Sequence, residues 1–306
     1  MQYSSESVFS GLFTGGPAQT GNGSLNSIQP SLVSSGTIQT GLARQLYNTS
    51  VGEVDYARSR RTQLTFVGSY GVVHFLDSGY INSANINGRV GYNYAPSAKN
   101  NIAVTYDHDR MSFVAGTTSR LQSDSVQMAF GRKVAGRLAF QVAAGPQLLN
   151  IENLGLSNSR RLSWSAFSAL AYQWRRTSYS LSYFRGVGSG SGVFAGSNNE
   201  TVTATANRQI TRSWSASVNG GYAINKTLVP VAISASQFDD WFASANLNRQ
   251  IGRQLRLGVS YGHQQQTSGV GGCPVRSCGL PTAFSQLGIT LQWHPLVKEL
   301  NSGDRK

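Results

Sequence analysis

The sequence predicts an all-β protein, and three observations lead to this fold class. Apolar and polar residues alternate over long stretches, which places successive side chains on opposite faces of a strand. Glycine, serine, threonine and asparagine are abundant and lysine is scarce, which disfavours long helices. Arginine-containing tight turns recur along the chain. The alternation is clearest near the C-terminal end, where every second residue is apolar: Leu287, Ile289, Leu291 and Trp293.

The pattern predicts thirteen strands in succession. Those that follow a tight turn begin near residues 62, 101, 138, 177, 213 and 255, so the repeat varies between 36 residues (213 − 177) and 42 (255 − 213). Each repeat has room for two long strands, whereas a propeller blade of similar length needs four short ones. The expected strands are residues 50–58, 62–75, 83–94, 101–114, 122–134, 138–151, 161–174, 177–190, 199–210, 213–226, 238–251, 255–266 and 283–293.

Short and long connections alternate between these strands. The short ones lie at residues 59–61, 135–137, 175–176, 211–212 and 252–253, with a looser one at 95–100. The long ones are rich in Gly, Ser and Asn and lie at residues 76–83, 115–121, 152–160, 189–198, 227–237 and 267–282. When all hairpins point the same way, the connectivity is that of an antiparallel up-and-down barrel.

Single-chain barrels of bacteria have an even number of strands. A weaker candidate at residues 37–46 would raise the count to fourteen, and twelve strands remain if the first one belongs to the N-terminal arm. We therefore expect three parts: a flexible arm or plug at residues 1–35, a barrel at 36–293 and a polar tail at 294–306.

The two faces of the strands differ in a way that indicates which solvent each one meets. The apolar face carries no charge, and charged residues make up only 13% of the chain, against about 25% in soluble domains. The side chains of the opposite face are small, polar and mostly neutral. A barrel with lipid on its outside and water on its inside explains the character of both faces. Candidates to line the lumen are Asn85, Asn87, Arg89, Thr105, Asp107, Asp109, Gln141, Ser165, Ser180, Ser217, Asn246 and Arg256.

Tryptophan and tyrosine recur near the ends of the apolar faces. Rings that lie partly in lipid and partly among headgroups form girdles at both membrane interfaces, although packing in an aromatic core is the alternative. The expected girdle residues are Tyr70, Tyr92, Trp164, Trp174, Trp214, Trp241 and Trp293. No run of about 18 apolar residues is present, which excludes a transmembrane helix. No secretory signal is visible, so an exported form would be a mature chain or a fragment.

Residues 50–293 resemble bacterial outer-membrane β-barrel proteins of the porin-like kind. Arginine-containing tight turns, strands such as RLSWSAFSALAYQW and TSYSLSYFRG, and a last strand SQLGITLQW that ends in an aromatic carry the resemblance. It implies short periplasmic turns, longer extracellular loops, contact with lipopolysaccharide, and recognition of the last strand by the outer-membrane insertion machinery. Many members end at this aromatic residue, whereas here a tail follows Trp293.

The net charge of +13 falls mainly on arginines beside the short turns. A groove-reading DNA-binding protein would show one basic face and a recognition element, so nucleic acid is not expected as a partner. The ring fits phosphate headgroups of the inner leaflet or a mouth that favours anions, and solvated turn residues are the remaining interpretation. Its members are Arg58, Arg60, Arg61, Arg132, Lys133, Arg137, Arg175, Arg176, Arg208, Arg212, Arg249 and Arg253.

The densest ionisable cluster is Asp107-His108-Asp109-Arg110. Acidic and histidine residues can activate water, and barrel proteases of the omptin type use them at the outer rim. On one strand, however, Asp107 and Asp109 face inward while His108 faces outward. We therefore expect a polar lumen or rim here and no enzyme.

Cys273 and Cys278 are the only cysteines and lie in the last long loop. A zinc site would need further ligands, and His263 is the only nearby candidate. A disulfide is the preferred interpretation, because an exported protein lies in an oxidising space. No metal and no cofactor are expected.

These features predict an integral outer-membrane barrel that lets small polar or anionic solutes diffuse through its lumen. The alternative is a non-conducting barrel that acts as a membrane anchor, scaffold or surface element, with its lumen filled by residues 1–35. The sequence names neither the solute nor the oligomeric state.

Overall fold

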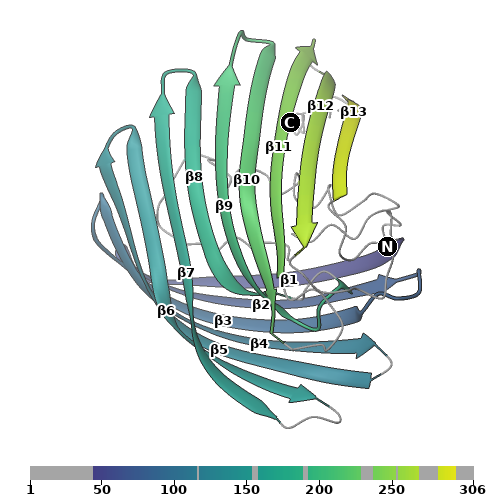
Figure 1. Cartoon of the computed structure of the whole chain (residues 1–306). Coiled ribbons are helices and arrows are strands. Elements are labelled where there is room, and N and C mark those ends of the chain that lie inside the picture. Colours follow the sequence, from purple (N-terminus) through teal and green to yellow (C-terminus); the bar gives the residue numbers. More distant parts are fainter. Residues whose placement is uncertain are drawn as a thin grey trace, which may run out of the picture.

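The computed structural model describes residues 44–115, 117–153, 158–188, 192–228, 237–252, 254–268 and 282–293. This part of the chain forms one antiparallel sheet, in which each strand pairs with its neighbours in sequence (Figure 1). The thirteen strands are β1 (Gln45–Ser59), β2 (Thr62–Phe75), β3 (Asn82–Ser97), β4 (Asn100–Ala115), β5 (Thr117–Ala135), β6 (Leu138–Asn153), β7 (Ser159–Trp174), β8 (Thr177–Gly188), β9 (Ser197–Gln209), β10 (Trp214–Thr227), β11 (Gln237–Ile251), β12 (Leu255–Ser268) and β13 (Thr282–Trp293).

The all-β, up-and-down antiparallel fold is thus confirmed, and each of the thirteen predicted strands is present. The candidate for a fourteenth strand overlaps β1, because Gln45 and Leu46 are the first two residues of β1. The rest of that candidate lies outside the described residues, as do the predicted arm at 1–35 and the tail at 294–306.

Short connections lie at one end of the strands, which we call the turn side, and most longer ones lie at the other end, the loop side. One predicted long loop, at residues 115–121, is wrong. β4 and β5 instead continue as a paired hairpin up to Ala115 and Thr117, with Val114 opposite Thr118. Valine and threonine favour the extended backbone of a strand, and Val114, Thr117 and Thr118 continue the ladder to the end of the hairpin.

The described sheet is open. β1 pairs with β2 and β13 pairs with β12, and neither edge strand has a second partner among the described residues. The outward apolar side chains of β13 are largely exposed, with Leu287 at 70% and Ile289 at 75% exposure.

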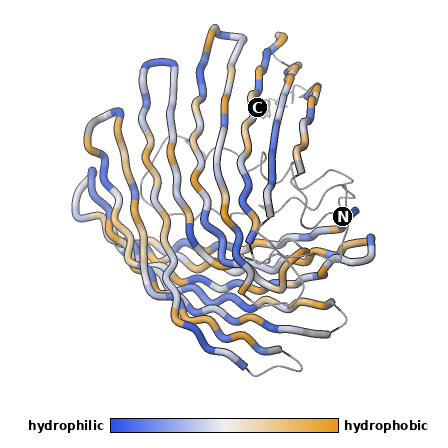
Figure 2. Tube along the Cα trace, in the orientation of Figure 1, coloured by the Kyte–Doolittle hydropathy of each residue, from blue (hydrophilic) through white to orange (hydrophobic). Residues whose placement is uncertain are grey.

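Side chains on the two faces of the sheet differ in solvent exposure, even when the residues are adjacent along a strand. Thr65, Thr105 and Ser165 are at most 9% exposed. Phe66, Tyr106 and Trp164, each next to one of these, are 44–46% exposed. We call the face of the first three the inner face and the other the outer face, and Figure 2 shows the resulting alternation of hydropathy along the strands.

The start of β1 is tied to the β2–β3 connection. The backbone N–H of Arg44 donates to Asp77 Oδ2 at 2.7 Å, and its guanidinium donates to Oδ1 at 2.8 Å. The side-chain hydrogen bonds from Arg44, together with the one from its backbone, lower the pKa of the Asp77 carboxyl. The stabilisation from these hydrogen bonds to the ionised carboxyl is therefore fully present at pH values above the unperturbed pKa of about 3.9. It is lost as the pH falls through the pKa of the folded protein, which is lower.

Replacing Asp77 with asparagine is expected to weaken protection of the Arg44 backbone N–H at neutral pH, because a charged acceptor is removed. Amide hydrogen exchange would measure this. The difference from the unmodified protein should shrink as the pH falls below 3.9, the usual carboxyl value. Equal protection of both proteins at pH 7 would contradict the assignment.

Candidate functional site

An apolar band crosses the outer face, and charged residues bound it on both sides. On β9 the band lies between Glu200 and Arg208, eight positions apart (208 − 200), and on β11 between Asp239 and Arg249, ten apart (249 − 239). At about 3.4 Å per residue and a tilt near 40°, these spans are roughly 20–26 Å, and a bilayer-spanning barrel has an apolar band about 25 Å tall. The part of the chain that the structure describes contains no helix long and apolar enough to span a membrane.

All seven predicted girdle residues lie on the outer face of the sheet. Their register partners on neighbouring strands are outer-face residues, as Tyr70 opposite Ile86 and Trp241 opposite Tyr222 illustrate. Several rings contact polar side chains at the loop-side border of the band. Trp164 lies under the Arg185 guanidinium at 4.2 Å, and Trp241 Nε1 donates to Gln265 at 3.2 Å. Such contacts suit rings with one apolar and one wet end.

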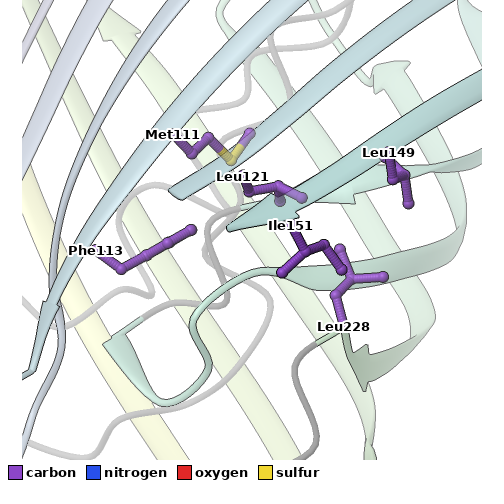
Figure 3. Packing of buried hydrophobic residues seen from close by; sticks show 6 residues of the cluster. All are labelled: Met111, Phe113, Leu121, Leu149, Ile151 and Leu228. Carbon is purple, nitrogen blue, oxygen red and sulfur yellow. The ribbon is translucent and has the colours of Figure 1, made fainter. Parts of the chain in front are cut away.

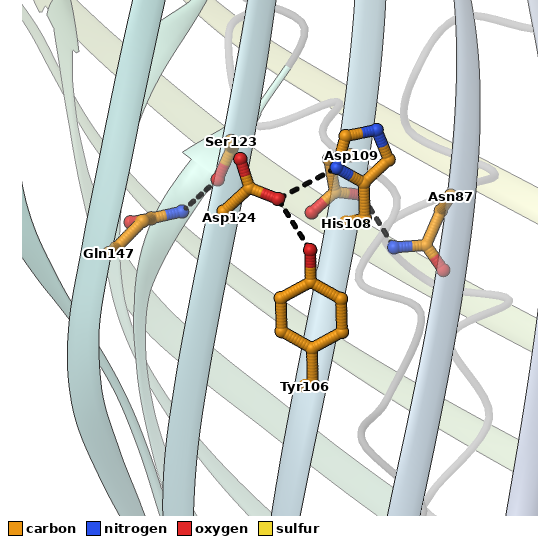
Figure 4. A network of polar contacts seen from close by, with 7 residues as sticks. All are labelled: Asn87, Tyr106, His108, Asp109, Ser123, Asp124 and Gln147. Carbon is orange, nitrogen blue, oxygen red and sulfur yellow. Dashed lines mark hydrogen bonds and ion pairs between the residues drawn. The ribbon is translucent and has the colours of Figure 1, made fainter. Parts of the chain in front are cut away.

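The predicted acidic cluster on β4 is divided between the two faces. His108 lies on the outer face, where its Nδ1 is 2.8 Å from Asp124 Oδ1, and the Tyr106 hydroxyl donates to the same oxygen at 2.7 Å (Figure 4). Asp107 and Asp109 lie on the inner face, where they pair with Arg89 and Asn87. The histidine and the two inner carboxylates therefore form no common site.

Each of the twelve predicted lumen-lining residues lies on the inner face. Cross-strand register places Arg89 opposite Asp107, Asn87 opposite Asp109, and Ser217 opposite Asn246. Polar contacts connect the wall further along: Gln147 Nε2 donates to Ser123 Oγ at 2.8 Å, Gln127 Nε2 to Ser165 Oγ at 2.9 Å, and Asn219 Nδ2 to Thr205 Oγ1 at 2.8 Å. Hydroxyls and amides thus form the inner wall over much of the sheet.

The loop-side end of the inner face departs from this polar character. A buried apolar cluster lies there, formed by Met111, Phe113, Leu121, Leu149, Ile151 and Leu228 (Figure 3). The inner face, which the sequence predicts to be small and polar, is therefore large and apolar at this end. β4, β5 and β6 supply five of the six side chains, and they are dry because another segment covers them.

That segment is Gly192–Gly196, between β8 and β9, and we call it the strap. Phe194 is 1% exposed and packs against the inner-face ring of Phe238 on β11, with ring centroids 5.4 Å apart. Ala195 packs against the apolar cluster of β4–β6, on the opposite part of the sheet. The strap therefore crosses the inside of the sheet at the loop side and joins two distant parts of the wall.

Backbone geometry and hydrogen bonds hold both ends of the strap. The amide of Ile81 donates to the Gly192 carbonyl at 2.8 Å, and the amide of Leu228 donates to the Gly196 carbonyl at 3.1 Å. Gly192 and Gly196 have φ of 78° and 90°, values that favour glycine. A Cβ at Gly192 would lie 2.3 Å from the Phe75 ring, so only glycine fits there.

The strap is absent from the sequence-based interpretation, which treats residues 189–198 only as a long connection rich in Gly, Ser and Asn. A signal exists in hindsight: Val193, Phe194 and Ala195 are three adjacent apolar residues inside a Gly- and Ser-rich connection. Exposed loops seldom carry such a run, and burial is its ordinary cause. Asp124 was missed as well, because its proximity to His108 depends on the β4–β5 register, which places the two residues directly opposite each other.

Some predicted features fall on other parts of the chain. Cys273 and Cys278, and with them the predicted disulfide, lie outside the described residues. Within the described ranges no group of three or more His, Cys, Asp or Glu side chains is placed to hold a metal ion.

Comparison with solved structures agrees with this architecture. The FrpB iron transporter from Neisseria meningitidis matches 74% of this chain with a TM-score of 0.54 at 7% identity. The siderophore receptor PiuA from Acinetobacter baumannii matches 78% with a TM-score of 0.50 at 8% identity. The unliganded ferric citrate transporter FecA matches 81% with a TM-score of 0.50 at 9% identity. The matches cover 44%, 49% and 47% of those three chains, respectively.

These solved structures are outer-membrane β-barrel proteins, and the described sheet has their fold. At 7–9% identity the similarity concerns the fold alone. No protein-family model and no curated protein matches the sequence. The class of protein is thus an outer-membrane-type β-barrel wall with a polar inner face and an inward-folded strap.

Proposed function

We propose that this chain is an integral protein of a bacterial outer membrane and forms a porin-like passage for small polar or anionic solutes. The observation that carries the proposal is the turn-side half of the inner face of β8–β12, where hydroxyls and amides are half-buried to exposed, as expected of a wall that meets water. Its representatives are Ser180, Thr203, Ser217, Asn219 and Asn246. Lipid contacts the outer apolar band, and water and solute occupy the space beside this wall.

The strap narrows the loop-side mouth of this passage. Loops that fold inward reduce the accessible cross-section without altering the strands, and the size of the remaining opening sets which solutes pass. Phe194 is 1% exposed, so its ring fastens the strap to the wall and does not line the opening, and the strap acts on solutes through the space that it takes up. We therefore expect a narrow channel with small unitary currents.

The proposal also includes the partners that this chain would contact during insertion and in the membrane. The aromatic end of β13, Trp293, is the element that the outer-membrane insertion machinery would recognise, and lipopolysaccharide would contact the loop-side outer face. The likeness to FrpB, PiuA and FecA concerns the fold, so transport of iron or siderophores is not carried over to this chain.

Planar-bilayer recording from purified, folded protein tests the proposal. Discrete current steps are expected, with conductance that depends on the size of the anion and cation present. Folding would be checked independently by the heat-dependent shift in electrophoretic mobility that closed barrels show. Folded protein that inserts but produces no steps would refute the channel.

The alternative is a non-conducting barrel that serves as an anchor, scaffold or surface element, with residues 1–35 in its lumen. Recording from a variant that lacks residues 1–35 separates the two. Steps that appear only in the shortened protein would favour the alternative, and equal currents from both proteins would remove it.

A further inference from the structure

A hollow on the inner face near the turn side is formed by three adjacent strands. Arg256 and Gly258 on β12 lie between Asn248 on β11 and Thr290 and Gln292 on β13. The register places Arg256 opposite Gln292, and Gly258 opposite both Asn248 and Thr290. Gly258 forms the floor, because a Cβ there would lie 2.8 Å from Asn248 Oδ1 and 3.7 Å from Thr290 Cβ. The absence of a side chain at Gly258 keeps the hollow open.

The positive charge of Arg256 is not neutralised by a neighbouring carboxylate in the described part of the chain. Ion pairs there join Arg44 to Asp77, Arg89 to Asp107, His108 to Asp124 and Arg185 to Glu200. Inner-face carboxylates occur on β1, on β4 and on the loop-side part of β11. The other side chains of the hollow are amides and a hydroxyl, which are neutral.

A second hollow adjoins the first and extends it along the turn side of the wall. The two share Asn248. The second is lined by Gln173, Arg176, Ser178, Asn207 and Ser215 among others, and it too has no acidic side chain in its lining. Three guanidinium groups, that of Arg256 in the first hollow and those of Arg176 and Arg208 in the second, thus lie among hydrogen-bond donors on a stretch of wall free of carboxylates.

We propose that the turn-side inner wall binds small oxyanions, with the hollow around Arg256 as the principal site. A guanidinium presents paired N–H donors that match two oxygens of a carboxylate or a phosphate. The amide groups of Asn248 and Gln292 and the hydroxyl of Thr290 supply further donors at the same place. The inference rests on the proposed function in one respect, since both require the inner face to be wet.

The loop-side half of the wall would act in the opposite sense on anions. Asp240 lies near the loop-side end of β11, Asp107 and Asp109 lie about midway along β4, and Glu53 and Asp55 lie in the turn-side half of β1. Along β8–β13, a solute that enters from the turn side therefore meets arginine before it meets carboxylate. Because charged rings set ion preference in pores, the turn side concentrates anions and the loop side does not.

Isothermal titration of the full-length protein, folded in uncharged detergent, tests the site without a conductance assay. The titrants are inorganic phosphate and acetate, each against a matched chloride buffer. Replacing Arg256 with glutamine is expected to weaken binding roughly tenfold to a hundredfold, the range for a lost hydrogen bond to a charged group. Arg110→Gln removes the same charge from the outer face and should leave the affinity unchanged.

Each outcome decides one point. Binding of phosphate alone, of acetate alone or of both, with loss only in Arg256→Gln, supports the site and says which oxyanion it prefers. No binding of either titrant, equal affinity in Arg256→Gln, or equal loss in both variants overturns it. Oxyanion binding without current steps would refute the channel and support the oxyanion site. Current steps without oxyanion binding would support the channel and refute the site.

Discussion

Replacing Phe194 with alanine is expected to raise the single-channel conductance and to make the current noisier. The ring is 1% exposed and packs on Phe238, and removing a buried phenylalanine side chain costs about 3–5 kcal/mol. A loss of about 3 kcal/mol shifts the ratio of undocked to docked strap by more than roughly a hundredfold. The strands of the wall do not depend on this contact, so the barrel itself should persist.

The matched control is Phe66→Ala, which removes the same side chain from the outer face, where it is 44% exposed. It should leave the conductance unchanged. Faster amide exchange at Ile81 and Leu228, whose N–H groups donate to the strap carbonyls, would show independently that the strap has left the wall. Undiminished protection at these amides would mean that Phe194 does not hold the strap. Faster exchange with an unchanged current would mean that the strap does not limit the passage.

Arginine introduced at two adjacent positions of β10 should have very different effects on stability. Val218 is 56% exposed and pairs with Ala206 and Ala245 on the outer face. Ser217 lies on the inner face opposite Asn207 and Asn246. Val218→Arg places a charge in hydrocarbon near the bilayer centre and is expected to reduce the free energy of unfolding by about 2–4 kcal/mol. Ser217→Arg keeps the charge in water and should cost less than about 1 kcal/mol, in line with ordinary surface changes.

Urea titration of protein folded into phospholipid vesicles measures both free energies. Because the two positions are adjacent on one strand, strand propensity and local backbone effects largely cancel in the comparison. Equal losses would mean that the same solvent meets both faces and would contradict a membrane-spanning wall. A larger loss at Ser217 than at Val218 would mean that the assignment of the faces is inverted.

The sequence predicts the strands well because the determining signals are local. A period of two and an arginine-containing turn are visible within about 15 residues, and the observed strands follow them. Alternation also assigns side chains to faces, which is why it correctly separates His108 from Asp107 and Asp109.

Features that depend on distant contacts could not be predicted in this way. The strap is defined by its contacts with Ile81, Leu228 and Phe238, which lie 32 to 111 residues away from their partners along the chain (228 − 196; 192 − 81). The hollow at Arg256 depends likewise on three strands in register. The sequence identifies Arg256 as a lumen candidate, but only the register shows that Asn248 and Gln292 are its neighbours.

The directions of the two edge strands, β1 and β13, determine how the open edges of the sheet can pair. β1 precedes a turn-side connection and β13 follows a loop-side one, so both run from the loop side to the turn side. Direct pairing of the two edges would therefore be parallel, and so would pairing of either edge with the same edge strand of a second copy inserted in the same orientation. A single strand that runs from the turn side to the loop side would pair antiparallel with both edges. It would also satisfy the backbone groups that hydrocarbon leaves without partners.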